Sequence, residues 1–237
     1  MKIQTLLASL LVSSAAMAQT PTMKPIVMKT PNEFQILAAS GNGKWACGVY
    51  SDYSNVQYGF LWNLETGEIE MLDPSKPSVA WSVSDDGLVV GQYEDTSYKS
   101  NGAAVELAGY WANGKWNRFE MPSDEVSGAG AASISPDGHY VTGHVEESGI
   151  YTGYIWKDGK IAKELINTNC SMPYAIAPDG QSDAGWIQRD NRTACIWEAD
   201  GEVTFLSDYQ SPWSSARKYT HDGKNLLYWG GWDDMEA

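Results

Sequence analysis

One position that recurs through the chain carries side chains able to recognise a ligand. It lies six residues before the glycine of a repeated turn and holds Leu37, Trp81, Ala132, Tyr174 and Arg217, with Trp213 close by. Aromatic faces stack on sugar rings or anchor a peptide, and a repeated place that varies in residue type suits a binding specificity. We therefore predict ligand-binding roles for Trp81, Tyr174, Trp213 and Arg217. The same pattern also fits aromatic side chains that only fill space, and that alternative stays open.

The groups that usually carry catalysis are not arranged for it. The histidines His139, His144 and His221 form no H-E-x-x-H or His-Cys ligand pattern, and no G-x-S-x-G elbow is present. Two carboxylates at a fixed separation can hydrolyse a glycosidic bond, but among 30 acidic residues no pair stands out. We therefore predict no catalytic residue, no cofactor and no metal site, and the sequence favours a binding protein over an enzyme.

Acidic residues recur four positions after a second repeated glycine, at Asp52, Asp95, Glu147 and Asp234. Hard cations take several carboxylate and carbonyl oxygens, so such turns could form a cation-binding rim. No loop has the dense D-x-D-x-D-G calcium spacing, however, and acidic side chains also simply solvate exposed turns. The sequence therefore favours acidic side chains that face solvent over a cation-binding rim.

These positions sit in a phrase that repeats along the chain. It reads WSVSDDGLVVG from Trp81, SISPDGHYVTG from Ser133 and AIAPDGQSDAG from Ala175, with fainter copies near both ends. The turn glycines Gly43, Gly87, Gly138, Gly180 and Gly223 and the later tryptophans Trp62, Trp111, Trp156 and Trp197 keep the same period of 41 to 51 residues. Such a period indicates a solenoid, a propeller or an array.

Each of the first four repeats contains four short β-rich runs separated by turns, most clearly in the third copy. Asn-Gly and Asp-Gly between alternating runs predict tight hairpins, and glycine density argues against helical arrays. We predict an all-β fold, a β-propeller of four-stranded antiparallel blades. The tryptophans would fill the wedge between blades, and the turn glycines would adopt positive φ. The predicted blades span about 34–73, 79–122, 130–168 and 173–208, with a partial blade at 213–237.

The fifth repeat lacks its second hairpin, which leaves two interpretations open. The segment from Lys24 to Lys29, within the N-terminal stretch 19–33, could cross over as an outer strand of a five-bladed ring. Alternatively, the chain is a truncated version of a protein with six to eight blades. An open blade edge is an aggregation hazard, so something has to complete this blade.

The N-terminal sequence predicts the compartment of the protein, and its net charge limits the possible partners. Residues 1–18 have a lysine, an apolar run and the triplet Ala16-Met17-Ala18, which predicts a cleaved signal peptide and an exported protein, periplasmic or extracellular. A net charge of -14 argues against nucleic acid, and no later stretch is long enough to insert into a membrane. Of three cysteines, Cys170 and Cys195 are the closer pair for one permitted disulfide.

The repeat resembles two kinds of exported bacterial propeller sequence. The residues that match are Ser84, Asp86, Gly87 and Gly91, then Ser135 to Gly138 with Gly143, then Ala177 to Gly180 with Gly185. They are similar to the HAF-type extracellular repeat and to the S-P-D-G repeats of TolB-like propellers. The resemblance implies fold and export more than activity.

We therefore expect a binding or interaction module at the cell surface or in the periplasm, with a carbohydrate or a protein as its partner. Two alternatives are a secreted propeller hydrolase or lyase acting on carbohydrate at the channel mouth, and a structural fragment of a longer surface protein. The oligomeric state is left open.

Overall fold

The computed structural model describes residues 33–52, 54–100, 102–165, 170–206 and 213–230, and all regular structure in these ranges is β-strand. The strands form four antiparallel sheets of four strands and one of two. The first sheet contains β1 (Glu33–Ala39), β2 (Trp45–Ser51), β3 (Gln57–Asn63) and β4 (Ile69–Met71). The second contains β5 (Ser78–Val83), β6 (Val89–Ser100), β7 (Ala103–Ala112) and β8 (Lys115–Arg118).

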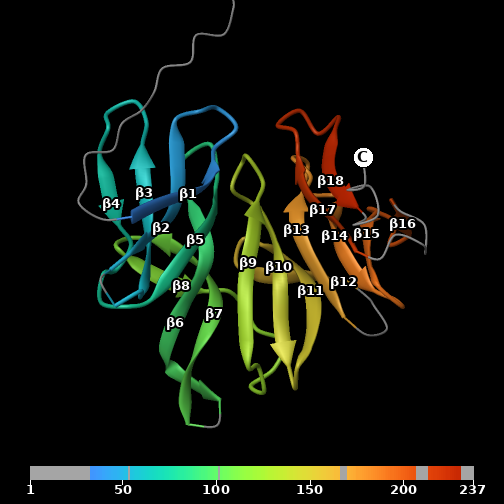
Figure 1. Cartoon of the computed structure of the whole chain (residues 1–237), viewed down its shortest axis with the longest axis horizontal. Coiled ribbons are helices and arrows are strands. Elements are labelled where there is room, and N and C mark those ends of the chain that lie inside the picture. The colour runs from blue at the N-terminus through green and yellow to red at the C-terminus, as the bar shows by residue number, and fades with distance from the viewer. Residues whose placement is uncertain (1–32, 53, 101, 166–169, 207–212, 231–237) are drawn as a thin grey trace, which may run out of the picture. The chain divides into compact units, whose positions relative to one another are not determined.

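The remaining sheets repeat this order. The third contains β9 (Gly128–Ile134), β10 (Tyr140–Glu147), β11 (Ile150–Lys157) and β12 (Lys160–Leu165). The fourth contains β13 (Ser171–Ile176), β14 (Asp183–Gln188), β15 (Arg192–Trp197) and β16 (Val203–Phe205), and the fifth contains β17 (Ser214–Tyr219) and β18 (Leu226–Gly230). The sheets follow one another in chain order, with β9 and β10 between the second and fourth sheets (Figure 1). The predicted all-β fold of four-stranded blades is confirmed.

The repeated phrase folds into a turn held by its own side chains. In the second sheet the Ser84 hydroxyl donates to the Asp86 carboxylate and accepts the backbone N–H of Leu88 at 3.0 Å. Ser135 and Asp137 repeat this arrangement in the third sheet. The glycine that follows adopts positive φ, 91° at Gly87 and 80° at Gly138, as predicted. A hydroxyl residue, an acid and a glycine thus close the turn between the first two strands.

A second glycine of the phrase lies opposite an irregularity of the first strand. In each sheet the register between the first two strands shifts by one residue, and the extra residue forms a β-bulge. At Gly91, on β6, a Cβ atom would come within 1.9 Å of the Val79 carbonyl oxygen, and at Gly143, on β10, within 2.0 Å of the Gly130 carbonyl oxygen. This glycine is required because the bulged backbone approaches too closely for any side chain.

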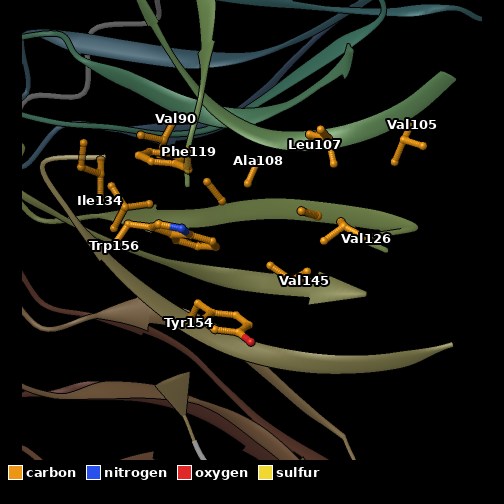
Figure 2. Close-up of a cluster of buried hydrophobic side chains, with 13 residues drawn as sticks. Val90, Val105, Leu107, Ala108, Phe119, Val126, Ile134, Val145, Tyr154 and Trp156 are labelled. Atoms are coloured by element: carbon orange, nitrogen blue, oxygen red, sulfur yellow. The ribbon is translucent and has the colours of Figure 1, made fainter. Parts of the chain in front are cut away.

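The core lies between neighbouring sheets. Trp156, on β11, is fully buried and stacks on Phe119 at a centroid distance of 5.3 Å, while its Nε1 donates to the Glu120 carbonyl at 2.8 Å. Figure 2 shows these rings among the aliphatic side chains of the second and third sheets, including Val90, Leu107 and Val145. Here a strand tryptophan fills the wedge between two blades.

The same tryptophan position is less regular elsewhere. Trp62 and Trp197 are buried, but Trp111 is only partly buried and donates from Nε1 to the Glu70 carboxylate at 2.9 Å. In that blade Trp116, one strand further on, takes the interior place and stacks on Tyr93 at 5.5 Å. The repeat therefore tolerates an exchange of tryptophans between adjacent strands.

The fifth sheet has only β17 and β18 within the described residues, and β18 is largely exposed. The His221 ring, in the turn between these strands, lies against Gly41 of the first sheet, where a Cβ atom would come within 1.9 Å of Nδ1. The fifth sheet thus contacts the first through this turn. The closing segment expected from Lys24 to Lys29 lies outside the described residues, as does the predicted signal peptide.

The structure contains no disulfide between Cys170 and Cys195. Cys195 is completely buried in β15, and Cys47 is completely buried in β2. Burial raises the pKa of both thiols, that of Cys47 to about 12, so both stay protonated at neutral pH. Buried thiols of this kind act as small apolar core residues.

Candidate functional site

A cavity of about 710 Å³ lies where the first strands of all five sheets meet. Its wall is built from small and apolar residues with a few polar groups, and the second strands of two sheets contribute as well. The lining consists of Leu37, Ala38, Ala39, Trp81, Gln92, Gly130, Ala132, His144, Met172, Tyr174, Arg217 and Lys218. A concave site of this size, mostly apolar with few polar groups, is suited to a small ligand or a short segment of a larger one.

The repeated variable position forms a ring around this cavity. Leu37, Trp81, Ala132, Tyr174 and Arg217 are the extra residues of the five β-bulges, and all five line the cavity. A bulge bends its strand and re-aims a side chain, which here directs each one out of the ladder and toward the cavity. The structure therefore brings together Trp81, Tyr174 and Arg217 of the predicted site.

Trp213 does not line this cavity. It is 43% exposed, and the guanidinium of Arg192 lies 4.8 Å from its ring centroid. The same guanidinium lies 4.5 Å from the ring of Trp186, so Trp213 belongs to an aromatic and cationic cluster beside the fourth sheet. Trp213 precedes β17 and lies apart from the repeated position of Arg217, and its ligand-binding role stays a prediction.

Arg217 and Tyr174 form one wall. The guanidinium of Arg217 lies 4.3 Å from the Tyr174 ring centroid and 5.9 Å from that of Trp229, so rings restrict it on two sides. The Tyr174 hydroxyl donates to the sulfur of Met172 at 2.9 Å and accepts the Nε1–H of Trp186 at 3.4 Å. These contacts hold the ring on which the guanidinium stacks.

Trp81 forms another wall of the cavity, and two successive hydrogen bonds hold its ring. Its Nε1 donates to Gln92 Oε1 at 3.2 Å, and Gln92 Nε2 donates to Glu106 at 2.7 Å. The amide of Gln92 is thus oriented by a carboxylate behind the lining, and the Trp81 side chain remains 40% exposed. An indole fixed at its edge and open on its surface is a stacking platform.

The cavity contains two further titratable side chains. Burial lowers the pKa of His144 to about 4, so this imidazole is neutral at pH 7, and its Nδ1 is buried without a hydrogen-bond partner among the described residues. The apolar surroundings of Lys218 lower its pKa, although the side chain is open to the cavity. Arg217 and Lys218 therefore supply the positive charge of the lining.

Sequence reasoning missed Gln92, His144, Met172 and Lys218 as lining residues. Gln92 and His144 directly follow the strand glycines Gly91 and Gly143, and each faces the cavity across the bulge. That offset from the glycine is a signal that the sequence contained. Lys218 directly follows the bulged Arg217, and two consecutive residues line the wall because the bulge breaks the alternation of side chains.

Three of the acids considered for a cation rim bind other groups of the protein. Asp52 accepts the backbone N–H of Ser54 at 2.8 Å, Asp95 is buried 3.5 Å from Arg118, and Glu147 accepts the hydroxyl of Ser123. Asp234 lies outside the described residues. Within the part of the chain that the structure describes, no three His, Cys, Asp or Glu side chains gather as metal ligands.

One buried acid is unusual but lies away from the cavity lining. Asp183, on β14, is fully buried, and neither carboxylate oxygen accepts a hydrogen bond of ordinary geometry from the described residues. Burial raises its pKa to about 7, and the Thr142 hydroxyl and the Lys163 ammonium counteract that rise. Asp183 thus approaches the neutral form inside the protein.

Comparison with known proteins identifies the fold. TolB from Acinetobacter baumannii is 17% identical, with a TM-score of 0.51 over 72% of this chain and 42% of that one. The putative TolB from Agrobacterium tumefaciens is 14% identical, with a TM-score of 0.54 over 81% and 72%. A prolyl endopeptidase structure is 9% identical, with a TM-score of 0.55 over 83% of this chain and 35% of its own.

These likenesses show that the chain has a TolB-like β-propeller fold, and they extend to the fold alone. The chain spans less than half the length of the Acinetobacter TolB and of the endopeptidase. No protein-family model and no curated protein matches it, so the predicted kinship with HAF-type repeats is not confirmed. No helix within the described residues is long and apolar enough to cross a bilayer.

Proposed function

We propose that this protein is an exported β-propeller binding module that holds a segment of a partner protein in the cavity at its first strands. The observation that carries the proposal is the convergence of five bulged side chains on one cavity. Trp81, Tyr174 and Arg217 would make the contacts, because tryptophan, tyrosine and arginine are the residue types enriched among the hot spots of protein interfaces.

The enzyme alternative has less support. A glycoside hydrolase requires two carboxylates on either side of the bond that it cleaves. Among the described residues that line the cavity there is no Asp or Glu. The acid of raised pKa, Asp183, is fully buried and does not line the cavity.

Binding is tested by probing peptide and glycan arrays with the purified protein and with a Trp81→Ala, Tyr174→Ala double variant. We expect peptide spots to bind the wild type and to lose most of their signal with the double variant. Phe205→Ala, an equally exposed aromatic of the fourth sheet, is the matched control and should bind like the wild type. Unchanged binding by a folded double variant would remove the cavity from the proposal.

Export rests on the N-terminal sequence and has its own test. Signal peptidase cleavage after Ala18 leaves Gln19 as the first residue, and N-terminal sequencing of protein recovered from the periplasm or the medium should find it. Protein that keeps Met1 and stays in the cytoplasm would contradict export without affecting the proposed site.

A further inference from the structure

The described cavity lining carries positive charge, although the protein as a whole is acidic. The chain carries a net charge of -14, yet the described lining residues include Arg217 and Lys218 and no carboxylate. Lys44, Arg118, Lys160 and Lys224 each form an ion pair with an acidic side chain. Neither Arg217 nor Lys218 forms an ion pair with an acid among the described residues, and both line the cavity.

Both cations point into the same space because of the fifth bulge. In β17 Ala216 pairs with Tyr228 and Lys218 pairs with Leu227, which leaves Arg217 as the extra residue. In a regular strand two consecutive side chains point to opposite faces, so this pair would be split. The bulge instead concentrates two positive charges at one point of the cavity wall.

The guanidinium is held ready for a planar anion. The Cζ atom of Arg217 lies 4.3 Å from the Tyr174 ring centroid, and no hydrogen bond to a described residue occupies the guanidinium N–H groups. Those groups match the two oxygens of a carboxylate in a bidentate pair, and an arginine restrained beforehand loses less entropy when it binds. A carboxylate bound there would also stabilise the ammonium of Lys218, whose charged form its apolar surroundings disfavour.

The rest of the lining fits an apolar body. Leu37, Ala132 and Met172 offer aliphatic surface, and Trp81 offers an open indole on a different sheet from Arg217. The other polar groups of the lining are the side chains of Gln92, His144 and Tyr174, and Gln92 and Tyr174 already bond within the protein. A sugar chain carries many hydroxyls that would stay unpaired against such a wall, at a cost for each.

We propose that the cavity captures the C-terminal carboxylate of a peptide whose last side chain is apolar. This rests on the proposed function and specifies its ligand. Arg217 and Lys218 bind the carboxylate, and the terminal side chain packs against Trp81 and the aliphatic wall. Capture of a chain end by fixed donors is a known mode of peptide recognition.

The test uses pools of fluorescent hexapeptides with randomised upstream positions and a terminal phenylalanine, with either a free carboxylate or an amide. Fluorescence anisotropy with the purified protein should show the free acid binding about tenfold or more tightly, since hydrogen bonds to charged groups are worth that much. Arg217→Gln should weaken the free acid by about tenfold and leave the amide unchanged. Lys224→Gln, which removes a lysine from the turn of the same sheet, is the charge-matched control.

The outcomes separate the carboxylate inference from the proposed peptide-binding function on which it rests. If acid and amide bind equally and the Trp81→Ala, Tyr174→Ala double variant weakens both, the carboxylate inference is wrong and the cavity still binds peptides. If the double variant weakens neither pool, the proposed function is wrong. Competitors with a different end test the preference for an apolar terminal side chain. If a pool ending in aspartate, or a glucuronate trisaccharide, competes as well as the phenylalanine pool, that preference is wrong. Lys218→Gln provides a second variant should Arg217→Gln fail to fold.

Discussion

Trp156 and Trp81 are both strand tryptophans of the repeat, but the first is fully buried and the second is 40% exposed. Trp156 pairs with Val141 on β10 and with Ile161 on β12, and its ring enters the wedge between two sheets. Trp81 is the extra residue of a bulge and is excluded from its ladder. The same residue type is thus core or cavity wall according to whether the backbone pairs at that residue.

The two regions also treat charge differently. The interior drives the buried Asp183 toward its neutral form, whereas the cavity keeps an arginine and a lysine open to solvent. Burial without a partner disfavours the charge of Asp183, and the apolar surroundings of Lys218 lower its pKa as well, whereas Arg217 is exposed to water. The comparison of wedge and cavity therefore predicts which substitutions damage stability and which damage binding.

Trp156→Ala should show the largest loss of stability, about 3 to 5 kcal/mol, because it empties a large volume from the wedge. The matched change Trp81→Ala should cost less than about 0.5 kcal/mol, since its side chain is half in solvent. Urea unfolding followed by circular dichroism measures both. Similar losses for the two variants would break the distinction between wedge and cavity.

The pH dependence of stability tests the contrast in charge through Asp183. Its folded pKa of about 7 exceeds the unfolded value near 3.9, so the folded form holds a proton that the unfolded chain loses. The contribution of Asp183 to stability is complete below pH 4 and falls by up to roughly 4 kcal/mol as pH rises through 7. Asp183→Asn cannot titrate, so the stability difference between it and the wild type should change over this window. A constant difference from pH 4 to 8 would contradict the assignment.

Gly91→Ala tests the close approach on which the Trp81 bulge depends. A Cβ atom there would come within 1.9 Å of the Val79 carbonyl oxygen, so the bulge must shift, at a cost of about 3 kcal/mol. At Gly59, where a Cβ atom would meet its nearest neighbours at 3.4 Å, the same substitution serves as the control and should cost far less. Chemical denaturation compares them, and equal costs would argue against the bulge as the reason for the glycine.

The smallest effect is expected at a hydrogen bond between sheets. The Ser171 hydroxyl, on β13, accepts the backbone N–H of Gly153, on β11, at 2.9 Å, and Ser171 is completely buried. Ser171→Ala leaves that N–H unpaired and should cost about 1 to 2 kcal/mol. Thermal melts measure both variants. Ser75→Ala, at an exposed turn, should be nearly neutral and serves as the control. A neutral Ser171→Ala would show that the wedge depends on apolar packing alone.

The repeat made much of this fold predictable. The turn glycines Gly43 to Gly223 and the acid before most of them marked each first hairpin, because their φ angles and side-chain bonds are local properties. Trp62, Trp156 and Trp197 are buried as a wedge residue should be. Trp111 departs from this because Trp116 competes for the same space, which depends on packing across strands.

The candidate site was predictable in part. A constant offset from the turn glycine located Trp81, Tyr174 and Arg217, and the same offset should have left out Trp213, which lies four residues from the repeated position. His144 was missed although it directly follows Gly143, and Lys218 was missed because the bulge at Arg217 breaks the alternation of side chains along β17. The resemblance to TolB-like propellers is confirmed for the fold, and the HAF-type kinship remains a prediction.

By itself the sequence determined the strands, the turns and the period, since these follow from local propensity and from a spacing that repeats. Only the tertiary structure decided that five bulged residues, spread over 181 positions from Leu37 to Arg217, share one cavity. It also decided that two cations meet there, with no acid among the described residues of the lining. The reason is physical: a bulge redirects side chains within one strand, but the arrangement of five sheets brings them together.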